Sequence, residues 1–274
     1  MVTHGKFLHD RNGDLPQKGM GTDMKVKLSN IPLYVLGVLS LIIVAYPLYF
    51  IIIASISDPG MVLNGEVWLV PKKLNLTGYK ELFKVNRIWT GYRNTCFYTI
   101  AGTAVSMLVT VPAAYAVSVK DLKIRKPIML FFIFTMFFNG GLIPTYLVIS
   151  QGLHMDNTIW VMIIPFCLNV YNMIIMRTFF ENSLPQELWE AAQLDGCSYT
   201  RYLVQVVIPL SKAVLSVIIL YYVVAKWNEY FTALIYIRDD SLVPLQIVLR
   251  DILIQNEAFS GADMGAAGLE ASKK

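Results

Sequence analysis

The sequence predicts an all-α fold, a polytopic bundle of transmembrane helices. Of its 274 residues, 55% are hydrophobic and 15% are charged, whereas about 25% of a soluble domain is charged. The mean hydropathy is +0.53. Several windows of about 20 residues contain almost no charge, and that is the helix length needed to cross a bilayer. We therefore expect five spans joined by short polar segments.

The first span is the apolar run 31–53, which follows a polar N-terminal tail, 1–30. As a helix the run is about 34 Å long, enough to cross the hydrocarbon core. A secretory signal has a shorter apolar core of about 7–15 residues and a small-residue cleavage site, which the following "ASIS" matches poorly. We interpret the run as a retained signal-anchor.

The second and third spans, 96–119 and 127–150, flank the basic segment "KDLKIRK". Before them, residues 54–95 are mixed, and the apolar spacing in "KKLNLTGYKELF" predicts a short interfacial amphipathic helix. Because basic residues in short loops favour the cytoplasmic side, we expect this segment and the N-terminus to be cytoplasmic.

The third span is expected to break near its middle, at Gly140, Gly141 and Pro144. Such a break permits the helix to bend as the protein changes conformation, or it simply permits close packing.

The fourth and fifth spans, 157–180 and 213–237, are separated by a polar stretch, 181–212. A cytoplasmic N-terminus leaves this stretch in the cytoplasm and residues 238–274 outside, as an outer loop.

Several classes of function are excluded by what the sequence lacks. The net charge of +4 is spread along the chain, which argues against nucleic-acid binding. The cysteines and histidines form no metal-binding spacing, so no metal or cofactor is expected. No phosphate-binding loop, GxSxG or HExxH motif occurs, so we expect no ATPase site and no enzyme activity.

The polar stretch is predicted to fold as a compact helix–turn–helix. Residues 183–186, "SLPQ", fit a capping box with Ser183 as the N-cap. The helix that follows should stop at Gly196, a residue suited to a left-handed C-cap position. A second short helix can begin at Ser198 and run towards Pro209. An ordinary interfacial amphipathic helix is the alternative.

Three short motifs in this stretch resemble the EAA loop of ABC importer permeases. They are Glu190-Ala191-Ala192, Asp195-Gly196 and Ile208-Pro209-Leu210. In that family the loop is a coupling helix that docks in a groove of the ATP-hydrolysing subunit. The resemblance implies that the coupling residues here are Glu190, Ala191, Ala192, Asp195, Gly196 and Pro209.

Two further stretches, "FNGGLIPTYLVIS" and "KWNEYFTALIYI", resemble carbohydrate-uptake permeases related to those of maltose transport, in the branch for complex oligosaccharides. The resemblance implies a multi-pass subunit of the bacterial cytoplasmic membrane that forms half of a translocation pathway. It also implies two ATP-binding subunits, a second homologous permease and an extracytoplasmic solute-binding protein, with 238–274 as the contact loop.

One departure from the family pattern concerns the C-terminus. Such permeases usually have six spans, but "GADMGAAGLEASKK" stands where the sixth should begin. We expect a truncated chain rather than an atypical permease with five spans.

Five residues are candidates for the transport pathway. Lys226 and Glu229 lie in the fifth span, and an ionisable pair at that depth either lines the pathway or gate, or forms a structural i, i+3 ion pair. Asn169, Asn172 and Tyr171 offer amides and an aromatic face to a sugar, although the amides could equally form interhelical hydrogen bonds.

Two other functions remain open. Permeases for peptides, amino acids or similar solutes share the coupling loop, so only the flanking stretches favour a sugar. A membrane enzyme or scaffold that transports nothing is the other, but the paired catalytic groups that an enzyme needs are not found.

Overall fold

The computed structural model describes residues 31–255, which divide into two units after Gly78. The first unit begins with α1 (Ile31–Ser55), a 25-residue helix. This helix carries no charged residue, as expected of a helix that crosses a bilayer. The predicted first span agrees closely with α1, while the predicted tail, 1–30, lies outside the described residues.

A short connection after α1 satisfies its own backbone. α2 (Pro59–Leu63) is capped by Asp58, whose carboxylate accepts a hydrogen bond from the first turn at 3.0 Å. The hydroxyl of Tyr46 in α1 donates to the carbonyl of Trp68 at 3.3 Å. The connection is therefore folded beside the end of α1.

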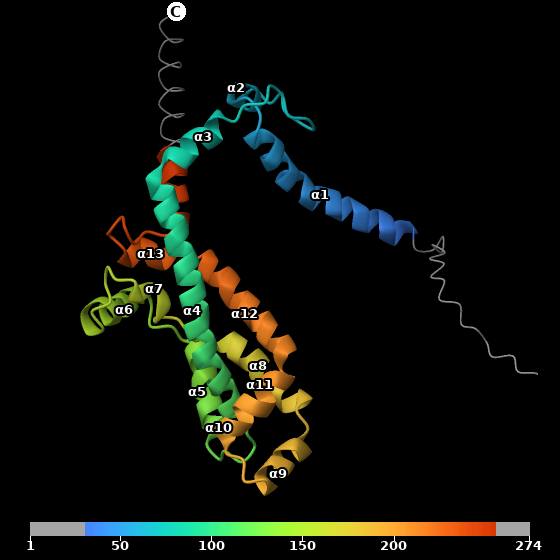
Figure 1. The fold of residues 1–274 in the computed structure, drawn as a ribbon, viewed down its shortest axis with the longest axis vertical. Coiled ribbons are helices and arrows are strands. Elements are labelled where there is room, and N and C mark those ends of the chain that lie inside the picture. The colour runs from blue at the N-terminus through green and yellow to red at the C-terminus, as the bar shows by residue number, and fades with distance from the viewer. Residues whose placement is uncertain (1–30, 256–274) are drawn as a thin grey trace, which may run out of the picture. The chain divides into compact units, whose positions relative to one another are not determined.

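In the second unit the main element is α4 (Asn86–Ser118), a 33-residue helix about 50 Å long, which α3 (Thr77–Lys84) precedes (Figure 1). The predicted span began at Cys96, so the prediction started this helix too late. Its first turns carry Arg87 and Asn94, which lower the local hydropathy but bond to residues far along the chain.

The predicted third span is bent rather than straight. It consists of α5 (Arg125–Phe137), α6 (Leu142–Leu147) and a π-helical turn (Val148–Gly152), and the two arms differ in direction by 110°. Gly141 has φ +87, a conformation that glycine adopts without strain. The side chain of Asn139 accepts from its N–H at 2.9 Å. The predicted break is confirmed.

The predicted fourth span, 157–180, is interrupted. It contains α7 (Trp160–Ile163) and α8 (Val170–Ser183). Between them, Pro165 removes an amide donor and Phe166 has φ +62. A helix cannot continue through such a pair.

The predicted fifth span, 213–237, is also divided, into α12 (Lys212–Trp227) and α13 (Phe231–Tyr236). Within the predicted outer loop, 238–274, a further helix occupies 245–255. The stretch "GADMGAAGLEASKK", on which the expected truncation depends, lies outside the described residues.

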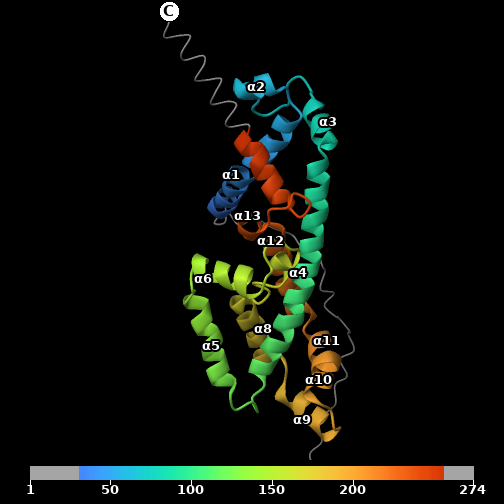
Figure 2. The ribbon, with the colours of Figure 1, turned by 90° about the vertical axis from the view of Figure 1, so that its left-hand side faces the viewer.

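The polar stretch forms the predicted helix–turn–helix at one end of the second unit (Figures 1 and 2). Its elements are α9 (Gln186–Leu194), α10 (Tyr199–Tyr202), a π-helical turn (Leu203–Val207) and α11 (Ile208–Leu210). A bend of 86° at the end of α11 leads into α12.

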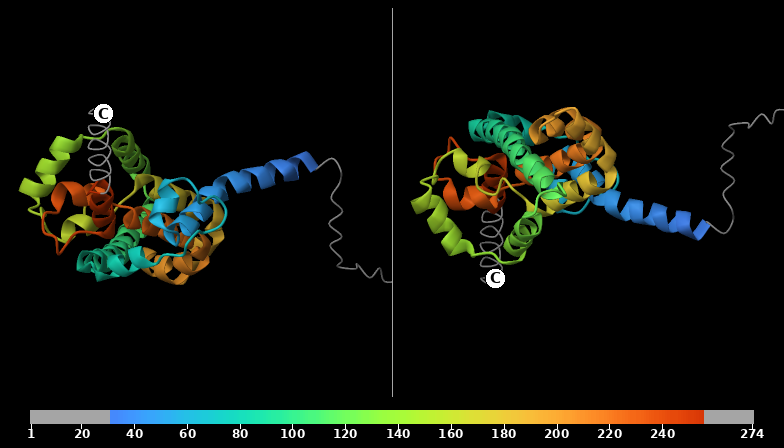
Figure 3. Two further views of the ribbon diagram at one scale, coloured as in Figure 1. Left: turned by 90° about the horizontal axis from the view of Figure 1, so that it is seen from above. Right: turned by 90° about the horizontal axis from the view of Figure 1, so that it is seen from below.

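Two clusters of buried side chains hold the second unit together, and α4 contributes to both. One cluster joins α4 to α8, α10 and α12. The other joins α4 to α7, α13 and the helix at 245–255. Figure 3 shows α5 and α6 on one side of this unit, with α10–α12 on the opposite side.

The all-α membrane fold is confirmed for the described residues, which contain helices and no strand. By length and composition, α1 and α4 can each cross a membrane, and the count rises to 4 if each bent pair, α5–α6 and α10–α12, is one span. The expected five spans therefore remain a prediction.

Candidate functional site

α9 ends in a hydrogen-bonded cap built on Gly196. This glycine has φ +70, so the predicted left-handed conformation is confirmed. Its N–H donates to the carbonyl of Gln193 at 3.0 Å, and the N–H of Cys197 donates to that of Ala192 at 2.9 Å. These bonds are those of a Schellman motif, which ends a helix and fixes the direction of the following chain.

The start of α9 differs from the prediction. Ser183 is the last residue of α8, and Pro185 precedes α9 without a side-chain cap. Proline cannot donate to continue α8 and disfavours helical backbone at Leu184, which is extended at φ −103 and ψ 111. The predicted capping box at Ser183 is therefore wrong.

The predicted coupling residues lie on two segments: Pro209 is on α11, and the others are on α9 and its cap. Most are exposed: Glu190, Ala191, Asp195, Gly196 and Pro209. Ala192 is half-buried and packs on the core cluster below. Beside them Leu194 is 91% exposed, so the end of α9 carries an apolar side chain at its surface.

An aromatic group fixes α9 to the rest of the unit. The ring of Trp189 stacks on Tyr199 with centroids 4.5 Å apart, and it meets Tyr202 edge-on at 5.0 Å. Asp121, in the loop between α4 and α5, accepts from the indole N–H at 3.3 Å and from the Tyr199 hydroxyl at 3.5 Å. One carboxylate thus links α9 and α10 to the end of α4.

A second contact from the same loop reaches the first turn of α9. The Lys120 ammonium donates to the side-chain carbonyl of Gln186 at 2.8 Å. The amide of Gln186 in turn donates to the Glu190 carboxylate at 3.1 Å. The basic loop predicted to be cytoplasmic therefore supports α9 directly.

Pro209 accounts for the π-helical turn that precedes it. Proline has no N–H to donate to the carbonyl four residues earlier. The helix widens at that point, and the N–H of Ile208 donates to the carbonyl of Leu203, five residues earlier.

Lys226 and Glu229 satisfy backbone groups at two helix breaks. The ammonium of Lys226 donates to the carbonyl of Met162 at 3.2 Å, where α7 ends and its last carbonyls lack helical partners. Glu229 accepts from the N–H and the hydroxyl of Thr232, at 3.1 and 2.9 Å, in the first turn of α13. No ion pair joins the two among the described residues.

The candidate sugar-binding trio does not share one face. The Asn169 side chain caps α8 by accepting from the N–H of Asn172 at 3.1 Å. Asn172 is 6% exposed, whereas Tyr171 is 59% exposed. The N–H of Asn169 donates to the Tyr222 hydroxyl at 3.1 Å. The side-chain amide of Asn169 thus stabilises the start of α8.

A cavity of about 370 Å³ lies between the break in the third predicted span and α13. Its lining includes Asn139, Gly141, Thr145, Phe166 and Glu229. Of the five candidate pathway residues, only Glu229 reaches this cavity. The cavity offers amide, hydroxyl and carboxylate groups beside an aromatic ring, a mixture that suits a polar solute.

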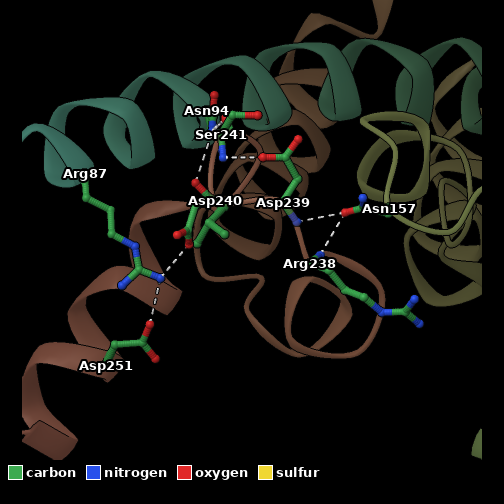
Figure 4. A network of polar contacts seen from close by, with 9 residues as sticks. Arg87, Asn94, Asn157, Arg238, Asp239, Asp240, Ser241 and Asp251 are labelled. Atoms are coloured by element: carbon green, nitrogen blue, oxygen red, sulfur yellow. Dashed lines mark hydrogen bonds and ion pairs between the residues drawn. The ribbon is translucent and has the colours of Figure 1, made fainter.

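The opposite end of the second unit carries polar residues that the sequence analysis missed (Figure 4). Arg87, at the start of α4, binds the carboxylates of Asp240 and Asp251, each at 3.0 Å. The Asn94 side chain donates to the carbonyl of Ser241 at 2.7 Å. The signal in the sequence was their spacing, since residues seven apart lie on one face of a helix.

The segment at 238–241 is held from its other side by Asn157. The amide oxygen of Asn157 accepts from the N–H groups of Arg238 and Asp239, at 2.8 and 2.9 Å (Figure 4). Asp239 accepts from the N–H of Ser241 at 2.8 Å, and this bond lowers the pKa of its carboxyl below the usual value. The segment is therefore a structured loop with exposed charges.

A family model described as "Binding-protein-dependent transport system inner membrane component" matches residues 88–255. This range begins near the start of α4 and ends with the last described residue.

Two curated proteins of Bacillus subtilis (strain 168) are similar to the chain. The polygalacturonan/rhamnogalacturonan transport system permease protein YtcP is 35% identical over 245 residues, which are 89% of this chain and 85% of that protein. Protein LplC is 36% identical over 211 residues, 77% of this chain and 71% of that protein.

The fold is similar to that of a chain in the crystal structure of a bacterial ABC transporter involved in the import of the acidic polysaccharide alginate. The TM-score is 0.77 at 32% identity, and the match covers 86% of each chain.

Proposed function

The chain belongs to the family of binding-protein-dependent transport system inner membrane components, and we propose that it is the permease subunit of an ATP-driven importer for a carbohydrate. YtcP and the alginate importer support a saccharide as the solute. In this proposal the chain lies in the bacterial cell membrane with its N-terminus in the cytoplasm, and it hydrolyses no ATP itself.

The observation that carries the proposal is the construction of α9. It is a short helix without buried residues, yet both of its ends are fixed, by the Gly196 cap and by the contacts of Gln186. Its outward surface has small and apolar residues, with Leu194 91% exposed. We infer that this surface docks on an ATP-binding subunit.

In this proposal a movement of α9 is transmitted to the membrane helices by two routes. The first passes through the Gly196 cap to α10, α11 and α12, since the cap fixes the direction of the chain. The second passes through Trp189 and Asp121 to the end of α4. ATP would hold two ATPase subunits together, and these routes would bias the permease towards one of its access states.

The remaining partners follow from the same assignment. A second homologous permease would complete the pathway, because this chain supplies about half of one. A solute-binding protein would dock on the loop near 238–241, whose charged residues are exposed. The cavity beside Glu229 is the proposed contact with the solute.

The test is uptake by an importer reconstituted from the chain, its companion permease, the ATPase subunits and the binding protein. Oligosaccharides of polygalacturonan, rhamnogalacturonan and alginate are the probes, since relatives are named for these polymers. We expect ATP-dependent accumulation of at least one of them. Accumulation of a peptide or an amino acid, with none of a saccharide, would contradict the proposal.

A further inference from the structure

A basic pocket lies between α5 and α8, close to the loop that supports α9. Its volume is about 290 Å³. The lining residues are Arg125, Lys126, Met129, Leu130, Ile133 and Arg177. The function proposed above makes no use of this pocket.

The two arginines of the pocket are fixed before any ligand arrives. The Glu181 carboxylate accepts from Arg177 at 2.7 Å and from Arg125 at 3.3 Å, and Arg177 also donates to the carbonyl of Val117 at 3.3 Å. Their side chains are only 26% and 25% exposed. Holding them in place therefore costs a ligand little additional entropy.

The pocket keeps a net positive charge after this pairing. Three cations, Arg125, Lys126 and Arg177, face one carboxylate, that of Glu181, so the charge is 3 − 1 = +2. The bonds described above use one donor of Arg125 and two of Arg177, and each guanidinium has five. Donors therefore remain for an anion with several oxygens, and phosphate suits a guanidinium well.

One wall of the pocket is apolar and continues along α5. Met129 and Ile133 are half-buried, and Leu130 is 68% exposed, with Phe134 one turn further on at 54%. A hydrocarbon chain could lie along this surface while a phosphate group stays at the arginines. A soluble phosphorylated ligand would have no use for such a wall.

We propose that this pocket binds an anionic phospholipid, with its headgroup phosphate at Arg125, Lys126 and Arg177 and an acyl chain along α5. Basic pockets between transmembrane helices bind anionic headgroups in this way. The cytoplasmic location of the pocket rests on the orientation proposed above, but the binding itself does not depend on transport. A bound lipid would stabilise the loop from α4 to α5 that supports α9.

The experiment is a binding titration of the full chain, purified in uncharged detergent, by native mass spectrometry. Dioleoylphosphatidylglycerol is the probe, and dioleoylphosphatidylcholine, with identical acyl chains, is the comparison. We expect saturable binding of the first and weaker binding of the second. Lys126→Gln should weaken phosphatidylglycerol binding about fivefold, the effect expected of one basic residue beside an anionic headgroup.

Lys123→Gln is the matched control, because Lys123 is exposed in the loop just before α5 but does not line the pocket. It should leave the affinity unchanged. Equal weakening by both variants would mean diffuse attraction and would overturn the proposal, as would equal binding of the two lipids. The proposal would also be overturned if millimolar inorganic phosphate displaced bound phosphatidylglycerol as effectively as added lipid does. That result would mean that the pocket is a site for small anions.

A final arm uses the assembled importer. Loss of the specific phosphatidylglycerol site when the companion permease is present would identify the pocket as a protein interface and reject a lipid. Because no arm requires ATP or solute, failure here and failure of the proposed transport function can be told apart.

Discussion

The two ends of the second unit are held together by different kinds of contact. At the end near 238–251, α4 and the helix at 245–255 are so close that a Cβ on Gly91 would lie 3.1 Å from the Cα of Leu245. Val248 beside it is 1% exposed. Polar bonds from Arg87 and Asn94 surround this contact. This end is interlocked through backbone, buried side chains and charge.

At the other end, α9 itself lacks this burial, although its half-buried Trp189 and Ala192 pack on the core cluster. α9 contains no buried residue, and it is attached by the Trp189 stack, the Asp121 carboxylate, the Lys120 contact and the Gly196 cap. Attachment through half-buried side chains and a cap, rather than through fully buried residues, is less rigid than the close backbone contact at the opposite end. This difference is consistent with the proposal that the α9 end receives force from the ATP-binding subunits while the other end stays fixed.

The largest effect on stability should follow from filling the close contact at the interlocked end. Gly91→Val would insert a branched side chain 3.1 Å from backbone atoms of the facing helix, and overpacking of this kind costs about 1–3 kcal/mol. We expect reduced yield of the folded chain and a lower midpoint in thermal unfolding. Gly78→Val is the control, because nothing lies within 4 Å of a Cβ there.

A smaller effect, on coupling rather than on stability, is expected at Asp121. Asp121→Ala removes the acceptor shared by Trp189 and Tyr199 and so breaks one of the two proposed routes from α9 into the membrane helices. Residues along a coupling route typically change it by about 0.5–2 kcal/mol. In the reconstituted importer, solute transported per ATP hydrolysed should fall about fivefold while the ATPase still binds. An unchanged ratio of solute transported to ATP hydrolysed would contradict the route through Asp121. The Gly196 cap would then be the only proposed route from α9 to the membrane helices.

The smallest effect is expected at Arg87, although it makes two ion pairs. Its side chain is 38% exposed and that of Asp240 is 78% exposed, so solvent screens much of the interaction. Arg87→Gln should therefore lower the free energy of unfolding by about 1 kcal/mol or less. The difference from the parent chain should shrink between 0.05 and 0.5 M salt. A larger loss in the free energy of unfolding that does not depend on salt would mean that Arg87 stabilises the fold by packing rather than by its ion pairs.

Features that depend on local sequence could be predicted. α1 matches its predicted run because a helix that crosses a bilayer is recognised by length and hydrophobicity alone. The left-handed Gly196 and the break at Gly141 could be expected because glycine adopts a positive φ without strain. Gly196 follows the end of α9, and Gly141 directly precedes α6.

Features that depend on contacts between residues distant in the sequence could not be predicted. The polar residues in the first turns of α4 hid the start of this helix in the sequence. The structure shows that one of them, Asn94, bonds to backbone carbonyls of the 238–251 segment. The i, i+3 spacing of Lys226 and Glu229 suggested a mutual pair, but a carbonyl in α7 and the start of α13 bind them instead. The roles of the coupling residues at a partner's surface stay predictions.

The most direct test of the account is capture of the ATP-binding subunits by the detergent-purified chain, comparing the parent, Gly196→Val and Gly78→Val. Valine at Gly196 meets no neighbouring atom but must adopt φ +70, at a cost of about 1–2 kcal/mol, so the cap should open while the fold persists. The account predicts capture by the parent and by Gly78→Val, and more than tenfold weaker capture by Gly196→Val. Equal capture by all three would contradict the assignment of α9 as the coupling helix.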